Sequence, residues 1–203
     1  RMAEFGALGI IHRYNTVDKQ ASMVAAASET GLKNVGAAIG ITGDYIERAA
    51  ALINAGASCL CLDVAHGDHI LMHVGAHNIV DKFGDKAHIM AGNIATYTGA
   101  LALGQIGVDS IRVGIGGGSI CSTRIQTGHG MPTLASVIEC ARAKEKYPNI
   151  KIVADGGIKT SGDMVKALAA GADFVMVGSL LAGTSEAPGE IIYKDGERFK
   201  SYR

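Results

Sequence analysis

One cysteine in the sequence lies among glycines, and it is the residue best placed to act as a nucleophile. Cys121 belongs to GIGGGSICSTRIQTGHGMP, residues 114–132, a segment with six glycines. Glycines let backbone amides converge on a phosphate, or backbone carbonyls converge on a cation. A thiol is a strong nucleophile once ionised, and Thr123 and Arg124 supply a hydroxyl and a positive charge close by. The segment predicts a ligand-binding loop with a reactive thiol; the alternative is a flexible loop in which the cysteine is incidental.

Two further short motifs have the composition of a nucleotide site. Asp155 precedes Gly156 and Gly157 at the end of one apolar run, and Gly178 precedes Ser179 at the end of the next. A carboxylate beside glycines can accept both hydroxyls of a ribose, and a Gly-Ser pair late in a barrel suits a phosphate. Together the motifs predict a bound nucleotide; the alternative is that each only forms a tight turn.

Polar side chains also follow two other apolar runs. Asp63 and Asn93 each end a run, where hydrogen bonds could select the ribose or amide of a cofactor. Spacings of three, four and four would place four histidines along one helical stripe: His66, His69, His73 and His77. Zinc ligands often have such spacing, but no cysteine or carboxylate pair completes the set, so we expect no metal there. The core should contain the remaining cysteines, Cys59, Cys61 and Cys140.

A repeated αβ unit would position these side chains. Three segments each combine a helix-like stretch, a Gly, two small or acidic residues and an apolar run: residues 54–63, 105–114 and 169–178. Gly56, Gly107 and Gly171 can adopt the left-handed conformation that ends a helix, before a strand buried on both faces. Parallel strands are therefore expected over residues 9–12, 35–39, 59–63, 88–91, 110–114, 151–154 and 174–178.

The intervening segments have helical periodicity. A helical apolar face is predicted from the spacing of Leu134, Val137, Ile138 and Ala141. A second helix is expected to begin at the N-cap Ser161.

The strand spacing favours a (β/α)8 TIM barrel over an open doubly wound sheet. Most strands start about 25 residues apart. This spacing suits a barrel, in which eight βα units normally share about 250 residues. The step from Ser110 to Lys151 is about forty residues, and its surplus follows a strand, where barrel enzymes carry catalytic loops. The doubly wound alternative needs G-x-G-x-x-G after the first strand, whereas residues 114–119 come late and lack the third glycine. Seven strands are one short of closure, and residues 1–7 read as the middle of a helix, so we expect the first strand to be missing.

Composition excludes several classes of protein. The chain has 203 residues, 48 % hydrophobic and 19 % charged, which indicates one globular domain over residues 1–203 rather than disorder. Nineteen basic residues balance nineteen acidic ones, so a nucleic-acid partner is not expected. The sequence shows neither a signal peptide nor an apolar run of membrane-spanning length, and four cysteines are too few for a disulfide scaffold. We expect a cytoplasmic protein without membrane contact.

Several motifs resemble the IMP dehydrogenase and GMP reductase family. They are GIGGGSICSTR (114–124), ADGG (154–157), SGDMVKALAAGADFVMVGSLLAGT (161–184) and EAPGE (186–190), and the resemblance extends from GALGIIHR to KSYR. It implies a barrel and hydride transfer between purine C2 and a nicotinamide cofactor, through a thioimidate on Cys121. Thr123 would assist proton transfer.

The resemblance also implies the roles of other residues. Asp155 would hold the ribose hydroxyls, with Met176 under the base. The rest of the nucleotide site would comprise Ser119, Gly156, Gly157, Gly178 and Ser179. The cofactor side would comprise Asp63, Asn93, Arg112 and Gly114. A potassium ion would be bound by carbonyls of Gly116, Gly118 and Cys121.

Two reactions remain open within the family. AHG at 65–67, GSLLAGT, EAPGE and KSYR resemble the dehydrogenase, which oxidises IMP to XMP with NAD in guanine nucleotide biosynthesis. Thr127-Gly128 and SVIEC at 136–140 resemble GMP reductase, which converts GMP to IMP with NADPH. We favour the dehydrogenase; a catalytically silent barrel that binds purine nucleotides is a third reading.

Departures from the family pattern lead to further expectations. The step from His12 to Val35 leaves no room for the regulatory CBS domain pair. Gly117 replaces the usual proline and should make the loop more flexible. The catalytic flap would follow Arg203 and is expected to be absent from the chain, and the family resemblance suggests a homotetramer.

Overall fold

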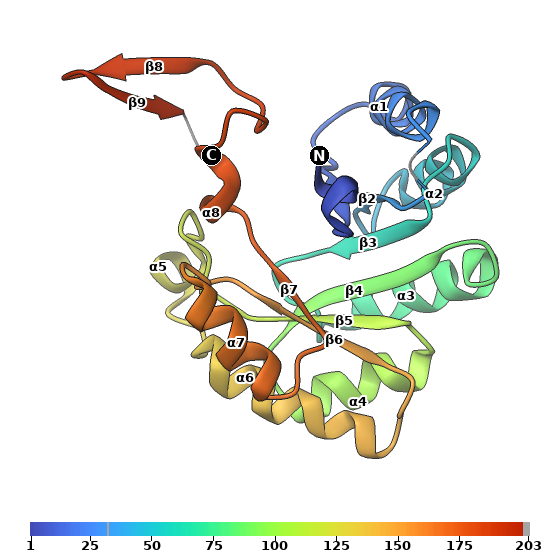
Figure 1. Ribbon diagram of the computed structural model, residues 1–203. Helices are drawn as coiled ribbons and strands as arrows, with labels where there is room; N and C mark the ends of the chain where they lie inside the picture. Colours follow the sequence, from blue (N-terminus) through green and yellow to red (C-terminus); the bar gives the residue numbers. More distant parts are fainter. Residues whose placement is uncertain (32, 201–203) are drawn as a thin grey trace.

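The computed structural model describes residues 1–31 and 33–200, and its main feature is a curved parallel sheet (Figure 1). Seven strands pair in sequence order, β1 to β7, and every pairing between them is parallel. The strands are β1 Gly9–Ile11, β2 Val35–Ile39, β3 Cys59–Asp63, β4 His88–Ile94, β5 Ser110–Val113, β6 Lys151–Asp155 and β7 Phe174–Met176. The predicted strands are therefore confirmed, with ends that differ by up to three residues.

Helices alternate with the strands and lie around the outside of the arc (Figure 1). They are α1 Val17–Glu29, α2 Tyr45–Asn54, α3 Ile70–Phe83, α4 Tyr97–Ile106, α6 Thr133–Ala141 and α7 Ser161–Ala169. The span between β1 and β2 is filled by α1. A parallel sheet whose strands pair in sequence order, with helices between successive strands, is the arrangement found in a TIM barrel. The fold is a partial (β/α)8 barrel.

The strands separate two apolar layers. The larger core lies between sheet and helices and includes Leu60, Leu62 and Ile111, all completely buried. A smaller cluster on the concave face contains Ala38, Cys59, Cys61, Met90 and Val153, with Met176 packed against it. Alternation along β3 explains the division, because successive side chains of a strand point to opposite faces. Cys59, Cys61 and Cys140 are buried, as predicted.

The repeated motif has a structural function at the amino ends of the strands. Its Gly56, Gly107 and Gly171 have positive φ values of 105°, 92° and 107°. The polar residue two positions later lies just before a strand, and its side chain accepts a hydrogen bond from the backbone N–H of the first or second residue of the preceding strand. These contacts are Val35 N to Ser58 Oγ at 3.1 Å, Ile89 N to Asp109 Oδ2 at 2.7 Å and Ile152 N to Asp173 Oδ2 at 2.7 Å.

Three local expectations were wrong in detail. Residues 1–7 are not the middle of a helix: the 3₁₀ turn η1, Met2–Phe5, ends at Gly6, which has φ 71°. The cap of α7 is Thr160 rather than Ser161, because the Thr160 hydroxyl and the Asp163 carboxylate form a reciprocal capping box. Helix α6 buries Ser136, Val137 and Cys140, whereas Leu134 and Ile138 are about half exposed.

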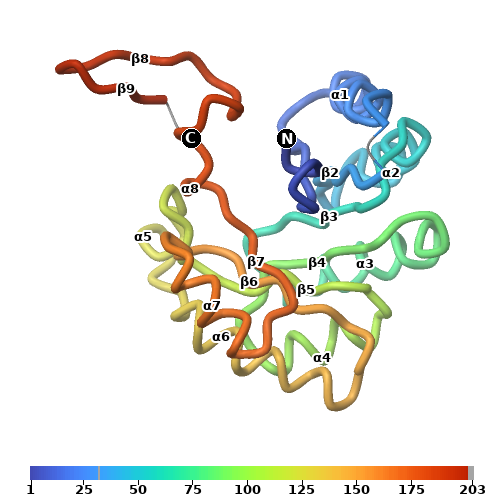
Figure 2. Tube along the Cα trace, viewed as in Figure 1, coloured from blue at the N-terminus to red at the C-terminus, as the bar shows by residue number. Residues whose placement is uncertain are grey.

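After β7 the chain leaves the sheet. A short helix, α8 Ser179–Ala182, leads to an antiparallel hairpin of β8 Ile191–Lys194 and β9 Glu197–Lys200 that projects from the barrel (Figure 2). The ammonium of Lys200 donates to the carbonyls of Thr184, Ser185 and Ala187, which ties the hairpin to the segment between α8 and β8. Across the described ranges, helices stay below the length and apolarity that membrane crossing requires.

We predict that Lys200→Met loosens this hairpin. An isolated two-stranded hairpin is only marginally stable, so the loss of three contacts at its base should favour local opening. Chymotryptic cleavage within residues 191–200 should be about threefold faster or more. The control is Lys194→Met, on exposed β8; equal cleavage of both variants would contradict the proposed tie.

Candidate active site

Cys121 lies in a loop whose neck is closed by hydrogen bonds. Met131 N donates to Ile115 O at 3.2 Å, and Arg124 Nη2 donates to Met131 O at 3.0 Å. Within the loop, Cys121 N donates to Gly118 O at 3.1 Å, and the short helix α5, Thr123–Thr127, follows. The loop is therefore a folded unit rather than a flexible linker.

Glycines press this loop against the turn that follows β6. Gly114 has φ 139°, and a Cβ there would lie 2.0 Å from the carbonyl oxygen of Asp155. A Cβ at Gly156 would lie 2.9 Å from Gly118 N. Such close approach of two backbones requires glycine. This approach brings the Cys121 loop beside the Asp155-Gly156-Gly157 turn. In the sequence, Cys121 and Asp155 are 34 positions apart.

The surroundings of Cys121 favour its thiolate. Thr123 Oγ1 lies 3.3 Å from Cys121 Sγ, and this contact lowers the pKa of the thiol, with smaller contributions from backbone N–H groups and Arg124. Burial acts in the opposite direction on the other cysteines. It raises the pKa of Cys59 and Cys140 to about 12 and that of Cys61 to about 11. Cys121 is thus the one of the four cysteines whose surroundings favour the thiolate.

We predict that Thr123→Ala raises the pKa of Cys121. The hydroxyl hydrogen bond is the largest cause of the lowered value, so its removal disfavours the thiolate. In the pH profile of iodoacetamide alkylation, the midpoint should move to higher pH. Cys140 serves as the internal control and should stay unmodified in the folded protein; an unchanged midpoint for Cys121 would contradict the role of Thr123.

A second group of polar side chains crosses the concave face at the carboxyl ends of β3 to β6. Asn93 Nδ2 donates to Asp155 Oδ2 at 2.9 Å and to Gly114 O at 2.7 Å. Arg112 donates to Asn93 Oδ1 through Nε and to Asp63 Oδ1 through Nη2. The register of β4 and β5 shifts at Asn93, which leaves this residue out of the ladder, as at a β-bulge. We call Asp63, Asn93, Arg112 and Asp155 the rim cluster.

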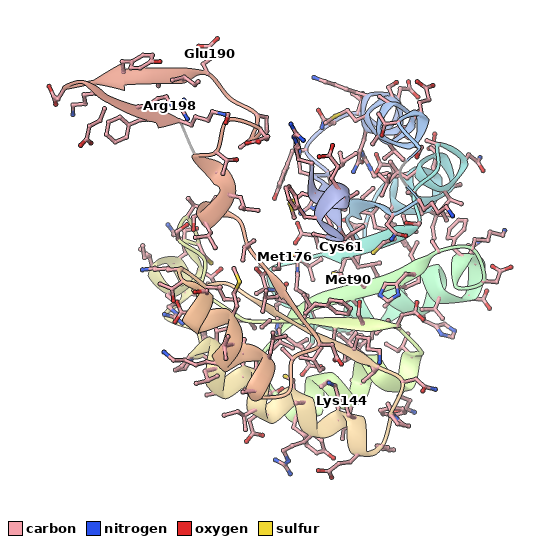
Figure 3. All side chains as sticks on the ribbon, viewed as in Figure 1. Cys61, Met90, Lys144, Met176, Glu190 and Arg198 are labelled. Atoms are coloured by element: carbon pink, nitrogen blue, oxygen red, sulfur yellow. The ribbon has the colours of Figure 1, made fainter. Side chains whose placement is uncertain are left out.

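Arg112 is the buried centre of the rim cluster. Its side chain is 11 % exposed, compared with 32 % for Asp63 and 27 % for Asp155. Its Nη1 faces the sulfur of Met176 at 3.8 Å, and Met176 lies on the concave side with Cys61 and Met90 (Figure 3). The guanidinium therefore orients the two acids and Asn93, and the more exposed acids remain available to a ligand.

The predicted nucleotide residues follow the last three strands of the sheet. Ser119 lies in the loop after β5, Gly156 and Gly157 in the turn after β6, and Gly178 and Ser179 at the start of α8 after β7. Carboxyl ends of parallel strands share one rim, so the fold gathers these residues at the rim that carries Cys121. Gly156 and Gly157 have positive φ values of 86° and 77°.

The four histidines do not form one helical stripe. His66 and His69 precede α3, where His69 is the N-cap and accepts from Leu71 N. His73 contacts Asp68 at 3.1 Å, whereas His66 and His69 pack ring edge against ring face. Over residues 1–31 and 33–200, metal-binding clusters of three or more His, Cys, Asp or Glu are absent.

Sequence reasoning missed one residue next to the rim cluster. Arg13 follows β1, and its Nε lies 3.7 Å from Asp63 Oδ2. Its position directly after an apolar run, like that of Asp63 and Asn93, was the available signal. Tyr202 and Arg203, part of the KSYR motif, lie outside the described residues.

Comparison with known proteins supports the resemblance seen in the motifs. Residues 1–203 match the IMP dehydrogenase / GMP reductase domain. Inosine-5'-monophosphate dehydrogenase of Nitrosopumilus maritimus is 49 % identical over 179 residues, covering 88 % of this chain and 37 % of that protein. GMP reductase of Leishmania major is 46 % identical over 198 residues, covering 97 % and 40 %.

A solved structure agrees with both sequence and fold. The crystal structure of a GMP reductase from Trypanosoma brucei superposes with a TM-score of 0.78 at 42 % identity, over 84 % of this chain and 38 % of that one. The chain thus spans about two fifths of the length of these relatives. Members of the matched family are oxidoreductases that use NAD(P). On the match over its whole length and on these identities, the chain belongs to the IMP dehydrogenase / GMP reductase family.

Proposed function

We propose that the protein is a purine nucleotide oxidoreductase that oxidises IMP to XMP with NAD through a covalent adduct on Cys121. The observation that carries the proposal is the contrast among the thiols. Cys121 is partly exposed with a lowered pKa, whereas burial raises the pKa of each of the other three. A thiolate beside a hydroxyl, in a loop packed on a potential ribose acceptor, suits covalent catalysis on a nucleotide.

In the proposed reaction, Cys121 Sγ adds to C2 of the purine, and the C2 hydrogen leaves with its electron pair as hydride. When bound, the nicotinamide cofactor supplies the acceptor for that hydride. Water then adds to C2 of the thioimidate and the C–S bond breaks, which yields XMP and the Cys121 thiolate and releases one proton to solvent. Thr123, 3.3 Å from Sγ, can donate a hydrogen bond to the thiolate before attack and after release.

The rim cluster fits a nucleotide and a dinucleotide cofactor. Asp155 and Asp63 are partly exposed carboxylates at the same rim and can accept ribose hydroxyls. Asn93 and Arg112 hold both acids in place, so their orientation exists before ligands bind. In this proposal Ser119, Gly157, Gly178 and Ser179 bind the nucleotide phosphate, and Met176 lies under the base.

The glycine loop has the donor chemistry for a potassium ion. Gly116 has φ 81°, and the turn between Gly118 and Cys121 brings the backbone of two of the three proposed ligands together. Gly118 O accepts from Cys121 N but retains a second lone pair. Such an ion would fix the backbone on either side of Cys121.

GMP reductase is the alternative, because GMP reductases are among the relatives and Thr127-Gly128 and SVIEC resemble that enzyme. In that reaction Sγ displaces ammonia from C2 of GMP, and hydride delivered to C2 releases IMP. We further propose a cytoplasmic homotetramer, by analogy with the family.

The test uses the complete gene product with both substrate pairs. IMP plus NAD should produce reduced cofactor faster than GMP plus NADPH produces oxidised cofactor. Release of ammonia from GMP without a reaction of IMP would assign the reductase. If neither pair reacts, intact-mass spectrometry finds no nucleotide on Cys121 and IMP still binds in a calorimetric titration, the protein is a catalytically silent nucleotide-binding barrel.

A further inference from the structure

The loop after β1 carries an arginine that the proposed function does not use. Arg13 lies at the carboxyl end of β1 (Gly9–Ile11), the rim that holds Cys121 and the rim cluster. Its side chain is 35 % exposed, three times the exposure of Arg112. The guanidinium faces Asp63 Oδ2 from one side, while Arg112 binds Asp63 Oδ1 from the other. Asp63 therefore lies between two arginines.

The two arginines differ in how far their donors are used. Arg112 directs its three nitrogens to Asn93, Asp63 and Met176. In contrast, Arg13 Nε is buried and has no hydrogen-bond partner in residues 1–31 and 33–200. A buried donor without an acceptor is costly, and a guanidinium hydrogen bond to an anion is among the strongest in proteins. Nε is turned toward Asp63, and the exposed part of the Arg13 side chain, which is 35 % exposed overall, can therefore take up a ligand at this rim.

The loop around Arg13 is rigidly held. The Arg13 guanidinium stacks over the Tyr14 ring, with Cζ 5.0 Å from the centroid. Arg48 Nη1 donates to Asn15 O at 3.0 Å and to Gln20 Oε1 at 2.7 Å. Gln20, a completely buried residue at the start of α1, donates to Ala38 O at 2.8 Å and Ile11 O at 3.3 Å, which ties the helix that follows the loop to the ends of β2 and β1. Because this order exists before binding, Arg13 loses less conformational entropy when a ligand binds.

We propose that Arg13 is a further binding residue of the cofactor site and that its guanidinium binds an anionic phosphate oxygen of the dinucleotide. The inference rests on the proposed function, which places the cofactor on the Asp63 side. The mononucleotide carries a phosphate too, but its proposed site follows β5 to β7, whereas the ion-pair neighbour of Arg13 is Asp63 of β3.

The test compares Arg13→Gln and Arg13→Lys with the control Arg142→Gln in the complete gene product. Arg142 also stacks on a tyrosine, with Cζ 4.6 Å from the ring centroid of Tyr97, but it lies in η2, Arg142–Glu145, before β6 rather than after a strand. Calorimetric titration with ADP-ribose, in saturating IMP, measures binding of the pyrophosphate without turnover. Affinity should fall about tenfold or more in Arg13→Gln and less in Arg13→Lys, which keeps the charge but not the fork.

Separate outcomes distinguish the two proposals. The affinity for IMP and the midpoint of thermal unfolding should match the wild type in both Arg13 variants. Unchanged ADP-ribose affinity, or a loss confined to IMP, would overturn the assignment of Arg13 to the cofactor. Equal losses for both ligands with a lower midpoint would show a structural role instead. Failure of the proposed reaction is read separately, from the absence of turnover in the wild type with either substrate pair.

Discussion

Cys121→Ser is expected to lower kcat by about 10³-fold or more while the affinity for the purine nucleotide changes by less than about threefold. The reason is the difference between a thiolate and a hydroxyl. Thr123 and the backbone neighbours of Cys121 lower the pKa of its thiol, which favours the nucleophilic thiolate. A serine hydroxyl in the same place stays protonated. Ribose and phosphate contacts come from other residues, so binding should persist.

The measurement has two readouts and a matched control. Absorbance of the reduced cofactor gives turnover, and intact-mass spectrometry of a quenched reaction gives the nucleotide adduct, which should be present in the wild type and missing from Cys121→Ser. Cys140→Ser is the control, because Cys140 Sγ lies 3.4 Å from Thr96 O and a serine hydroxyl can donate to the same carbonyl. Turnover that survives in Cys121→Ser would remove the thioimidate mechanism.

The strands and their common rim could be predicted because their signals are local. Each buried run, such as CLCLD of β3, is bounded by glycine or polar residues, and the side chains at its carboxyl end must share a rim with those of its parallel neighbours. The three Gly turns were predicted for the same reason. The hydrogen bonds from backbone N–H groups to Asp109 and Asp173 could not be predicted. In the sequence, an aspartate that accepts from a neighbouring strand looks the same as an aspartate that only lies in a short connection.

The links within the rim cluster depend on curvature and register, which the sequence does not show. Asn93 reaches Asp155 because β4 and β5 shift register at this residue. Arg112 reaches Asp63 because residues on β5 and β3 meet across the concave face of the sheet. Arg13 was missed because its contact spans β1 to β3. The histidine spacing misled for the opposite reason: a period of four indicates one helix only if the helix includes every member, and α3 begins after His69.

Gly114→Ala is expected to destabilise the protein by about 3 kcal/mol or more, the largest effect on stability that we predict. Its φ of 139° disfavours any side chain, and the added Cβ would lie 2.0 Å from the Asp155 carbonyl. The added methyl group is fixed to the backbone and meets a backbone carbonyl, so no rotamer change can relieve the contact. Separating them must move Gly114 O, the acceptor of Asn93 Nδ2, and with it the link from Asn93 to Asp155.

Two other glycines of the same loop separate the causes of this loss. Gly128 has φ 69° but open space around a Cβ, so Gly128→Ala should cost only the left-handed conformation, about 1 kcal/mol. At Gly118 a Cβ would lie 3.4 Å from that of Cys121, an ordinary contact, so Gly118→Ala should change stability by less than about 0.5 kcal/mol. Urea denaturation of the three variants gives the order. If Gly114→Ala is no worse than Gly128→Ala, the loop after β5 does not press on the turn after β6, and Cys121 is not held beside Asp155 in the way that the proposed reaction requires.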